Sequence, residues 1–150
     1  MPWLVRAQAQ AQESAPTRKL GVALVGLGSL STHQIAPALQ NTKFCRLAGV
    51  VSGTPSKIQA WQEKYRIPAS HCYSYAEFDR IRDNPDIDIV YVVLPNSMHA
   101  EYTVRAAKAG KHVYCEKPMA NSVRECEQMI AACRDAKRKL GIGYRCQFTP

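Results

Sequence analysis

The chain has 150 residues, of which 46% are hydrophobic, and its formal net charge is +8 at pH 7. This length suits one domain with a real core, and no apolar run reaches the roughly 20 residues of a transmembrane helix, which argues against a membrane protein. The excess of Lys and Arg suits an anionic, phosphorylated ligand. It is spread along the chain without a recognition motif, so nucleic-acid binding is not expected.

The N-terminal residues and the cysteines give weaker indications of domain limits, metal binding and cellular compartment. Residues 1–18, rich in Ala and Gln, predict a disordered tail or the remnant of an export signal, and residues 19–150 are expected to form one domain. The cysteines show neither Cys-x-x-Cys pairs nor zinc-type spacing with histidine, so we expect no metal site. Free thiols favour a reducing cytoplasmic compartment, whereas an even count also permits disulfides. An export signal would instead mean a periplasmic location. The cysteines are Cys45, Cys72, Cys115, Cys126, Cys133 and Cys146.

The first predicted strand, residues 20–25, is an unbroken apolar run that leads into a glycine turn. In a strand–turn–helix unit the first glycine permits the tight turn, and the second lets a pyrophosphate approach the main chain at the helix N-terminus. Ser31 stands where the dinucleotide fingerprint has Gly or Ala, and such turns also use glycine for geometry alone. The predicted cofactor contacts in this loop are Gly26, Leu27, Gly28, Ser29 and Leu30.

Strand and helix patterns alternate along the rest of the chain. Further strands are predicted at 44–51, 73–75, 87–94, 111–115 and 140–144, and helices at 30–40, 55–65, 75–82, 98–109 and 122–139. Pro37 should kink the first helix, Thr54 should cap the second, and Gly110 should end the fourth. This alternation predicts an α/β fold, a Rossmann-type doubly wound parallel sheet, with ligands at the carboxyl ends of its strands.

For the last predicted helix, 122–139, the sequence also predicts which residues lie in the last turn and which lie on the apolar side. Lys137, Arg138 and Lys139 should lie in its last turn, where cations suit the helix dipole. Its apolar side should carry Val123, Cys126, Met129, Ile130 and Cys133.

The end of the second strand bears on the choice of cofactor. An NAD site usually has Asp or Glu there, bonded to the ribose 2′-hydroxyl, but this chain has Ser52 and Gly53, followed by Lys57 one turn into the next helix. Hydroxyls and an ammonium group would bind a 2′-phosphate that a carboxylate repels. We therefore predict NADP rather than NAD. The alternative is that Ser52 and Thr54 only cap the helix and Lys57 is a solvated charge.

Two further strand ends carry candidate residues. Leu94 ends the fourth predicted strand, and Pro95, Asn96 and His99 follow it; we predict that these four residues contact the cofactor. The alternative is a capping Asn or Ser with a surface histidine. Glu116 and Lys117 directly follow the fifth predicted strand. Lys117 is the predicted catalytic residue, because a lysine beside a nicotinamide can exchange a proton with a substrate hydroxyl. The alternative is a surface ion pair, which contributes little to stability.

The motifs at 26–28, 94–100, 109–113, 115–120 and 143–146 resemble, in order and spacing, those of the Gfo/Idh/MocA oxidoreductases. The resemblance implies a Rossmann domain that holds NADP, with Lys117 near nicotinamide and sugar and with Glu116 and Asn96 lining the cleft. It matches Ser52 and Lys57 to positions that bind the 2′-phosphate in sugar oxidoreductases, and Arg145 to an arginine near the active site. Family members continue into a second α/β domain that binds substrate and forms the oligomer, which this chain does not reach.

The function expected from the sequence is therefore the NADP-binding domain of an oxidoreductase that transfers hydride between a nicotinamide and a sugar or polyol. The substrate would bind through a second domain, a homo-oligomer would form only at full length, and these 150 residues alone would turn over little or no substrate. The alternative is a non-catalytic dinucleotide-binding sensor.

Overall fold

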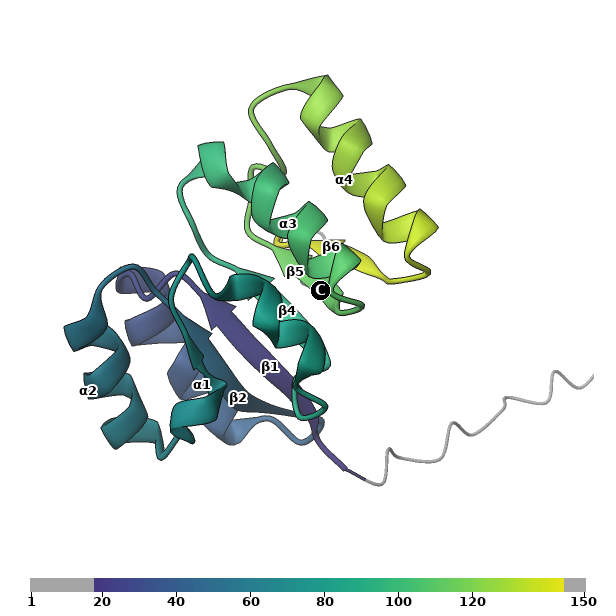
Figure 1. Ribbon diagram of the computed structural model, residues 1–150. Coiled ribbons are helices and arrows are strands. Elements are labelled where there is room, and N and C mark those ends of the chain that lie inside the picture. Colours follow the sequence, from purple (N-terminus) through teal and green to yellow (C-terminus); the bar gives the residue numbers. More distant parts are fainter. Residues whose placement is uncertain (1–17, 145–150) are drawn as a thin grey trace, which may run out of the picture.

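The computed structural model describes residues 18–144, which form a six-stranded parallel sheet (Figure 1). Its strand order, β3-β2-β1-β4-β5-β6, is that of the doubly wound dinucleotide-binding fold. The Rossmann prediction is confirmed. The strands are β1 (Leu20–Val25), β2 (Cys45–Val51), β3 (Cys72–Tyr73), β4 (Ile89–Val92), β5 (His112–Cys115) and β6 (Leu140–Ile142). The α-helices are α1 (Ala36–Asn41), α2 (Pro55–Tyr65), α3 (His99–Lys108) and α4 (Val123–Asp135).

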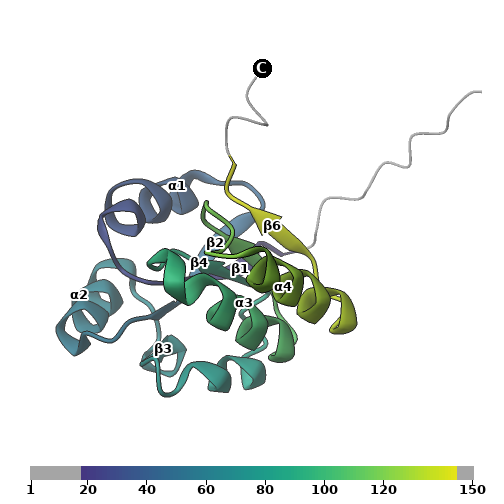
Figure 2. The same ribbon diagram turned by 90° about the horizontal axis from the view of Figure 1, so that it is seen from above.

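Helices cover the two faces of the sheet unequally. One core joins Val22 and Val50 of the sheet to Ala36 of α1 and Trp61 of α2. The opposite core packs the sheet against α3 and α4 (Figure 2), and it contains these buried side chains: Phe78, Ile81, Val90, Val92, Tyr102 and Met129. Beside α1, Tyr91, Tyr114 and Leu140 help to line an apolar cavity of about 540 Å³ over β4, β5 and β6.

The first helical segment departs from a plain kinked helix. Helical backbone runs from residue 29 to 41, but Ser31–Ile35 is a π-helical turn before α1 begins. The amide of Ala36 donates to the carbonyl oxygen of Ser31, five residues back. Because Pro37 has no N–H and crowds the preceding turn, a π-turn just before it is a physically reasonable accommodation.

The predicted helices at 75–82 and 122–139 are wrong in part. The first is a 3-10 segment, Phe78–Asp83. The second ends at Asp135, and Lys137, at φ 55°, has left-handed backbone outside α4, so residues 137–139 are not in its last turn. Val123 and Ile130, expected on the apolar side, are 76% and 53% exposed, whereas Met129 and Cys133 are buried.

Other boundaries differ by a few residues. The third strand is Cys72–Tyr73 rather than 73–75, β4 is shorter than 87–94, and β6 stops at Ile142. Thr54 is the N-cap residue of α2 but makes no side-chain capping bond. Gly110 ends α3 as predicted: its φ is 76°, and the amide of Lys111 donates to the carbonyl of Ala106. Residues 1–17 of the predicted tail at 1–18 lie outside the described residues, as do Arg145 and Cys146.

Candidate functional site

The strand register brings the predicted site segments to one edge of the sheet. Val25 pairs with Val51 on one side and Val92 on the other, Val92 pairs with Cys115, and Cys115 pairs with Ile142. The residues that directly follow these strands therefore share the carboxyl edge. They are Gly26, Ser52, Val93, Glu116 and Gly143.

The two glycines of the first turn meet different constraints. Gly26 has φ 97°, and a Cβ there would collide with the carbonyl oxygen of Val93 and lie 2.9 Å from Leu94 Cδ2. Local geometry therefore requires glycine at this position. Gly28 is exposed, its φ is not positive, and a Cβ would meet no described atom within 4 Å. Neither packing nor backbone strain requires glycine at this position, and the open space leaves the main chain accessible to a ligand.

Ser31 replaces the third small residue of the fingerprint without disturbing the turn. It is completely buried, and its hydroxyl donates to the carbonyl oxygen of Gly26 at 2.6 Å. The helical ladder begins close by, where the amide of Thr32 donates to the carbonyl of Gly28 at 3.0 Å. The helix thus opens at the glycine turn, with Ser29 exposed, Leu30 half-buried and Leu27 buried beneath.

The second strand end has no acidic residue. Ser52 is buried, its Oγ accepts from the amide of Thr54 at 3.2 Å, and its own amide donates to the carbonyl of Tyr73. Gly53 lies under the Tyr75 ring, which a Cβ would approach to 3.0 Å. Lys57 is exposed in the first turns of α2. A hydroxyl, a glycine and an ammonium group at this edge fit a 2′-phosphate better than a bare ribose.

The turn after β4 does not match the alternative of a capping Asn or Ser with a surface histidine. Neither Asn96 nor Ser97 caps α3, whose N-cap residue is Met98. His99 is only 1% exposed, so the alternative of a surface histidine is wrong. Both of its ring nitrogens face backbone carbonyl groups. Leu94 is buried and Pro95 is exposed, and Asn96 and Ser97 are the polar side chains that this turn presents to solvent.

The end of β5 forms a polar rim over an apolar cavity. Glu116 is buried and accepts a hydrogen bond of 2.6 Å from the Tyr91 hydroxyl, and Lys117 beside it is exposed. A Cβ at Gly143 would lie 3.0 Å from the Glu116 carboxylate, so this glycine leaves room for it. The cavity is about 430 Å³ and is lined by Leu30, Gln34, Ile35, Ala38, Leu39, Thr42, Tyr91, Glu116 and Lys117.

Tyr91 and Gly143 were not among the predicted site residues. The period-2 pattern of β4 places Tyr91 on the half-buried face of its strand, but its bond to Glu116 spans 25 residues. Only the register of β4 against β5 reveals this pair.

The described cysteines are structural thiols. Cys45, Cys72, Cys115, Cys126 and Cys133 are free, and burial raises the pKa of Cys115 to about 12, so this thiol stays protonated at neutral pH. Within residues 18–144, no group of three or more His, Cys, Asp or Glu side chains could hold a metal ion. No helix in that part of the chain is long and apolar enough to cross a bilayer.

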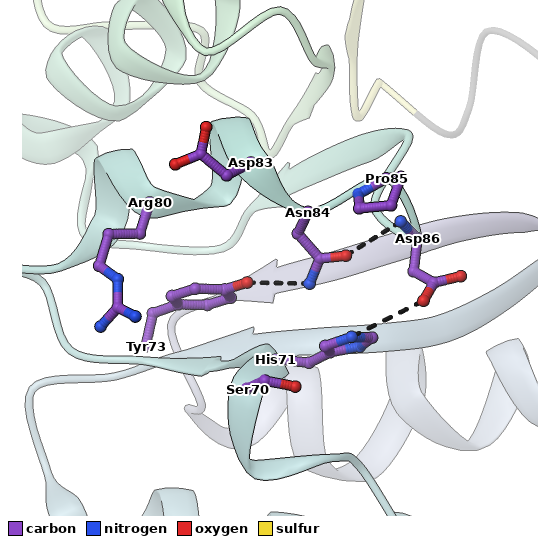
Figure 3. A pocket seen from close by; sticks show the side chains of 8 residues that line it. All are labelled: Ser70, His71, Tyr73, Arg80, Asp83, Asn84, Pro85 and Asp86. Atoms are coloured by element: carbon purple, nitrogen blue, oxygen red, sulfur yellow. Dashed lines mark hydrogen bonds and ion pairs between the residues drawn. The ribbon is translucent and has the colours of Figure 1, made fainter.

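A third cavity, of about 300 Å³, lies at the opposite, amino end of β3 and β4 (Figure 3). Asn84 donates to the Tyr73 hydroxyl at 2.9 Å and accepts from the amide of Asp86 at 2.9 Å. His71 Nε2 lies 3.7 Å from an oxygen of Asp86. These groups form hydrogen bonds or an ion pair with one another across the cavity, whereas the glycine turn is open to solvent at Gly28.

The strand order, the glycine turn and the helix that opens on it define a dinucleotide-binding Rossmann domain. The profile of the Gfo/Idh/MocA oxidoreductase family, described as an oxidoreductase family with an NAD-binding Rossmann fold, matches residues 20–144, and the chain belongs to that family.

Relatives with known activities include two sugar or polyol dehydrogenases. An NADP(+) D-xylose 1-dehydrogenase of Haloarcula marismortui is 30% identical over 142 residues, which cover 93% of this chain and 38% of that protein. An inositol 2-dehydrogenase of Salmonella typhimurium is 29% identical over 85% of this chain and 37% of its own length. The chain thus spans under two fifths of these relatives.

Solved structures agree with this assignment. An aldose-aldose oxidoreductase of Caulobacter crescentus, complexed with glycerol, shares 59% identity with a TM-score of 0.86, covering 88% of this chain and 39% of that one. A 3-ketoreductase of Actinomadura kijaniata, complexed with TDP-benzene and NADP, shares 25% identity with a TM-score of 0.78, covering 89% and 40%.

Proposed function

We propose that this chain binds NADP and is the cofactor domain of an oxidoreductase that acts on a sugar or polyol. The observation that carries the proposal is the open space at Gly28, on the same edge as Ser52 and Lys57. A Cβ at Gly28 would fill the place where we propose that a pyrophosphate approaches the main chain, although no described part of the protein requires glycine there. The residues present therefore fit a dinucleotide.

Three groups of residues would contact different parts of the cofactor. Gly26, Leu27, Gly28, Ser29 and Leu30 would surround the pyrophosphate; Ser52, Gly53 and Lys57 would bind the 2′-phosphate; and Leu94, Pro95 and Asn96 would line the cleft. When bound, the nicotinamide supplies hydride exchange with a substrate carbon. Arg145, which follows β6 in sequence, is proposed to lie near the same site.

Lys117 is the proposed proton-handling residue. It is exposed at the mouth of the cavity that Glu116 and Tyr91 help to line, so its ammonium group can reach a ligand there. In the complete enzyme it would hold or move the proton of the reacting substrate hydroxyl. Substrate would bind with the help of a further domain, as the greater length of the relatives suggests, and oligomers would form in that longer protein. The free thiols favour a reducing compartment.

Isothermal titration with NADP and NAD tests the cofactor assignment. We expect NADP to bind at least about tenfold more tightly, since a charge-assisted hydrogen bond contributes about 1.5–3 kcal/mol. Lys57→Ala should remove most of this preference and leave NAD affinity unchanged. Lys64→Ala, the same charge loss two turns further along α2, is the matched control and should bind like the unsubstituted protein. Equal affinities for the two cofactors would contradict the proposed role of Ser52 and Lys57.

A further inference from the structure

His99 joins two segments of the carboxyl edge. It is the first residue of α3 and is 1% exposed. Its Nδ1 lies 2.8 Å from the carbonyl oxygen of Pro118, in the turn after β5, and its Nε2 lies 2.8 Å from the carbonyl oxygen of Leu94, in the turn after β4. Both partners can only accept hydrogen bonds.

Two accepting partners restrict the state of the ring. A neutral imidazole carries one hydrogen and one bare nitrogen, so in either tautomer a nitrogen lone pair would face a carbonyl oxygen at 2.8 Å. Rotating the ring by 180° would put carbon atoms in the two nitrogen positions, which leaves both carbonyl groups without a strong donor. A ring with hydrogen on both nitrogens satisfies both carbonyl groups at once.

His112 provides a contrast within the same chain. Its Nδ1 accepts a hydrogen bond of 2.9 Å from the amide of Lys139. That contact requires a bare Nδ1 and therefore a neutral ring. The structure thus assigns opposite roles to Nδ1 in these two histidines.

We infer that His99 is a doubly protonated positioning residue, which donates from both ring nitrogens and thereby ties the end of β4 to the turn that carries Lys117. Leu94 precedes the exposed Pro95 and Asn96, and Pro118 directly follows Lys117. One ring therefore fixes the main chain on two sides of the proposed nicotinamide site. The importance of this tie for a cofactor rests on the proposed function, whereas the state of the ring does not.

Charged side chains around α3 are engaged elsewhere. Arg105 bonds to Glu101 and Asp79, the carboxylate of Glu116 accepts from Tyr91, and that of Glu125 accepts from the amide of Asn121. Among the described residues, neither these groups nor Lys117 bonds to the His99 ring. The two carbonyl dipoles are its hydrogen-bonding partners and offset the cost of placing its charge in a buried site.

Long-range proton–nitrogen NMR of the ¹⁵N-labelled protein at pH 7, without cofactor, tests the inference directly. We expect both ring nitrogens of His99 to carry hydrogen, and Nδ1 of His112 to be bare. A bare nitrogen in His99 would overturn the inference. This measurement needs no substitution, so it decides even if variants fold poorly.

Hydrogen exchange tests the positioning role. His99→Gln keeps a single amide nitrogen, which cannot reach carbonyl groups on opposite sides of the ring. It should accelerate exchange at the amides of Lys117, Met119 and Ala120 about tenfold, the effect of losing one hydrogen bond to a charged group. His112→Gln should leave these amides unchanged and affect Lys139 instead. Unchanged exchange in folded His99→Gln would overturn the role, whereas a failure of NADP to bind would contradict only the proposed function.

Discussion

Gly26 and Gly28 are separated by one residue in the same turn, yet the surrounding structure constrains only Gly26 to be glycine. The positive φ of Gly26 and the nearby Val93 carbonyl make it a demand of the fold. Gly28 meets no such limit, which fits the proposed close approach of a ligand to the main chain at this position. The same turn therefore combines a glycine that the fold requires with a glycine that we propose contacts the cofactor.

We predict opposite results for alanine at these two positions. Gly26→Ala should cost about 3 kcal/mol or more of unfolding free energy, because it combines left-handed backbone strain with a collision against main chain. Gly28→Ala should change stability by less than about 1 kcal/mol but weaken NADP binding at least tenfold. Urea unfolding and calorimetric titration measure the two quantities. A Gly28→Ala protein with full NADP affinity would argue against the pyrophosphate role.

At the scale of the element, α4 illustrates how sequence periodicity can misplace a face. Five apolar or cysteine side chains suggest one stripe, but only Met129 and Cys133 are buried, and Val123 and Ile130 are exposed. A helix in this fold buries the face that packs against its neighbours, and the neighbours of α4 are α3 and the sheet. Val123 is in the first turn, and Ile130, next to the fully buried Met129, is rotated about 100° away from it.

Substitutions of adjacent residues test this assignment of faces. Met129→Ala should lower the free energy of unfolding by about 2–4 kcal/mol, because it leaves a cavity in the core beneath α3 and α4. Ile130→Ala should change it by less than about 1 kcal/mol, because its side chain is already largely in water. Urea unfolding followed by circular dichroism compares them. Similar losses in the two variants would mean that Ile130 is covered.

At the scale of the whole molecule, the two edges of the sheet differ. The carboxyl edge holds the glycine turn, Ser52 and Lys117, whereas the amino edge is closed by ion pairs and hydrogen bonds. Arg18 donates to both oxygens of Asp88, at 2.7 and 2.8 Å, and the amide of Gly21 donates to the same carboxylate at 2.7 Å. This arrangement joins the start of β1 to the segment before β4.

Asp88 should make the stability of the fold depend on pH. Burial raises the pKa of Asp88, but hydrogen bonds from Arg18 and Gly21 and the Arg18 charge outweigh it and lower the pKa below its ordinary value. The unfolded chain then takes up the proton first, so this stabilisation is present above about pH 4 and is lost as pH falls through the folded-state pKa.

Removing the carboxylate should remove this dependence. Asp88→Asn should lose about 1 kcal/mol at pH 7, a modest value since Arg18 is largely exposed, and its stability should fall less than that of the unsubstituted protein from pH 5 to pH 3. Asp135→Asn, an exposed aspartate, is the control and should follow the unsubstituted protein. Urea midpoints at each pH provide the measurement. Parallel pH profiles for Asp88→Asn and the unsubstituted protein would refute the role of Asp88.

Much of this molecule could be predicted from the amino-acid sequence. Apolar runs and glycine turns are local patterns, so they predicted the alternating elements, the parallel sheet and the position of Gly26, Ser52 and Lys117 at the carboxyl ends of its strands. Helix ends were less predictable: α4 ends at Asp135 because the chain turns into left-handed backbone at Lys137, which a run of basic residues does not signal.

Only the tertiary structure decided which polar groups meet. The Tyr91–Glu116 bond depends on the register of two strands, and the burial of His99 depends on the path of the turn after β5. Hydrogen-bond partners far apart in the chain are set by packing, which is a property of the assembled sheet and not of any local segment. The sequence by itself therefore determined the dinucleotide fold and the edge of the sheet at which the proposed site lies, and the packed structure determined which contacts hold that edge together.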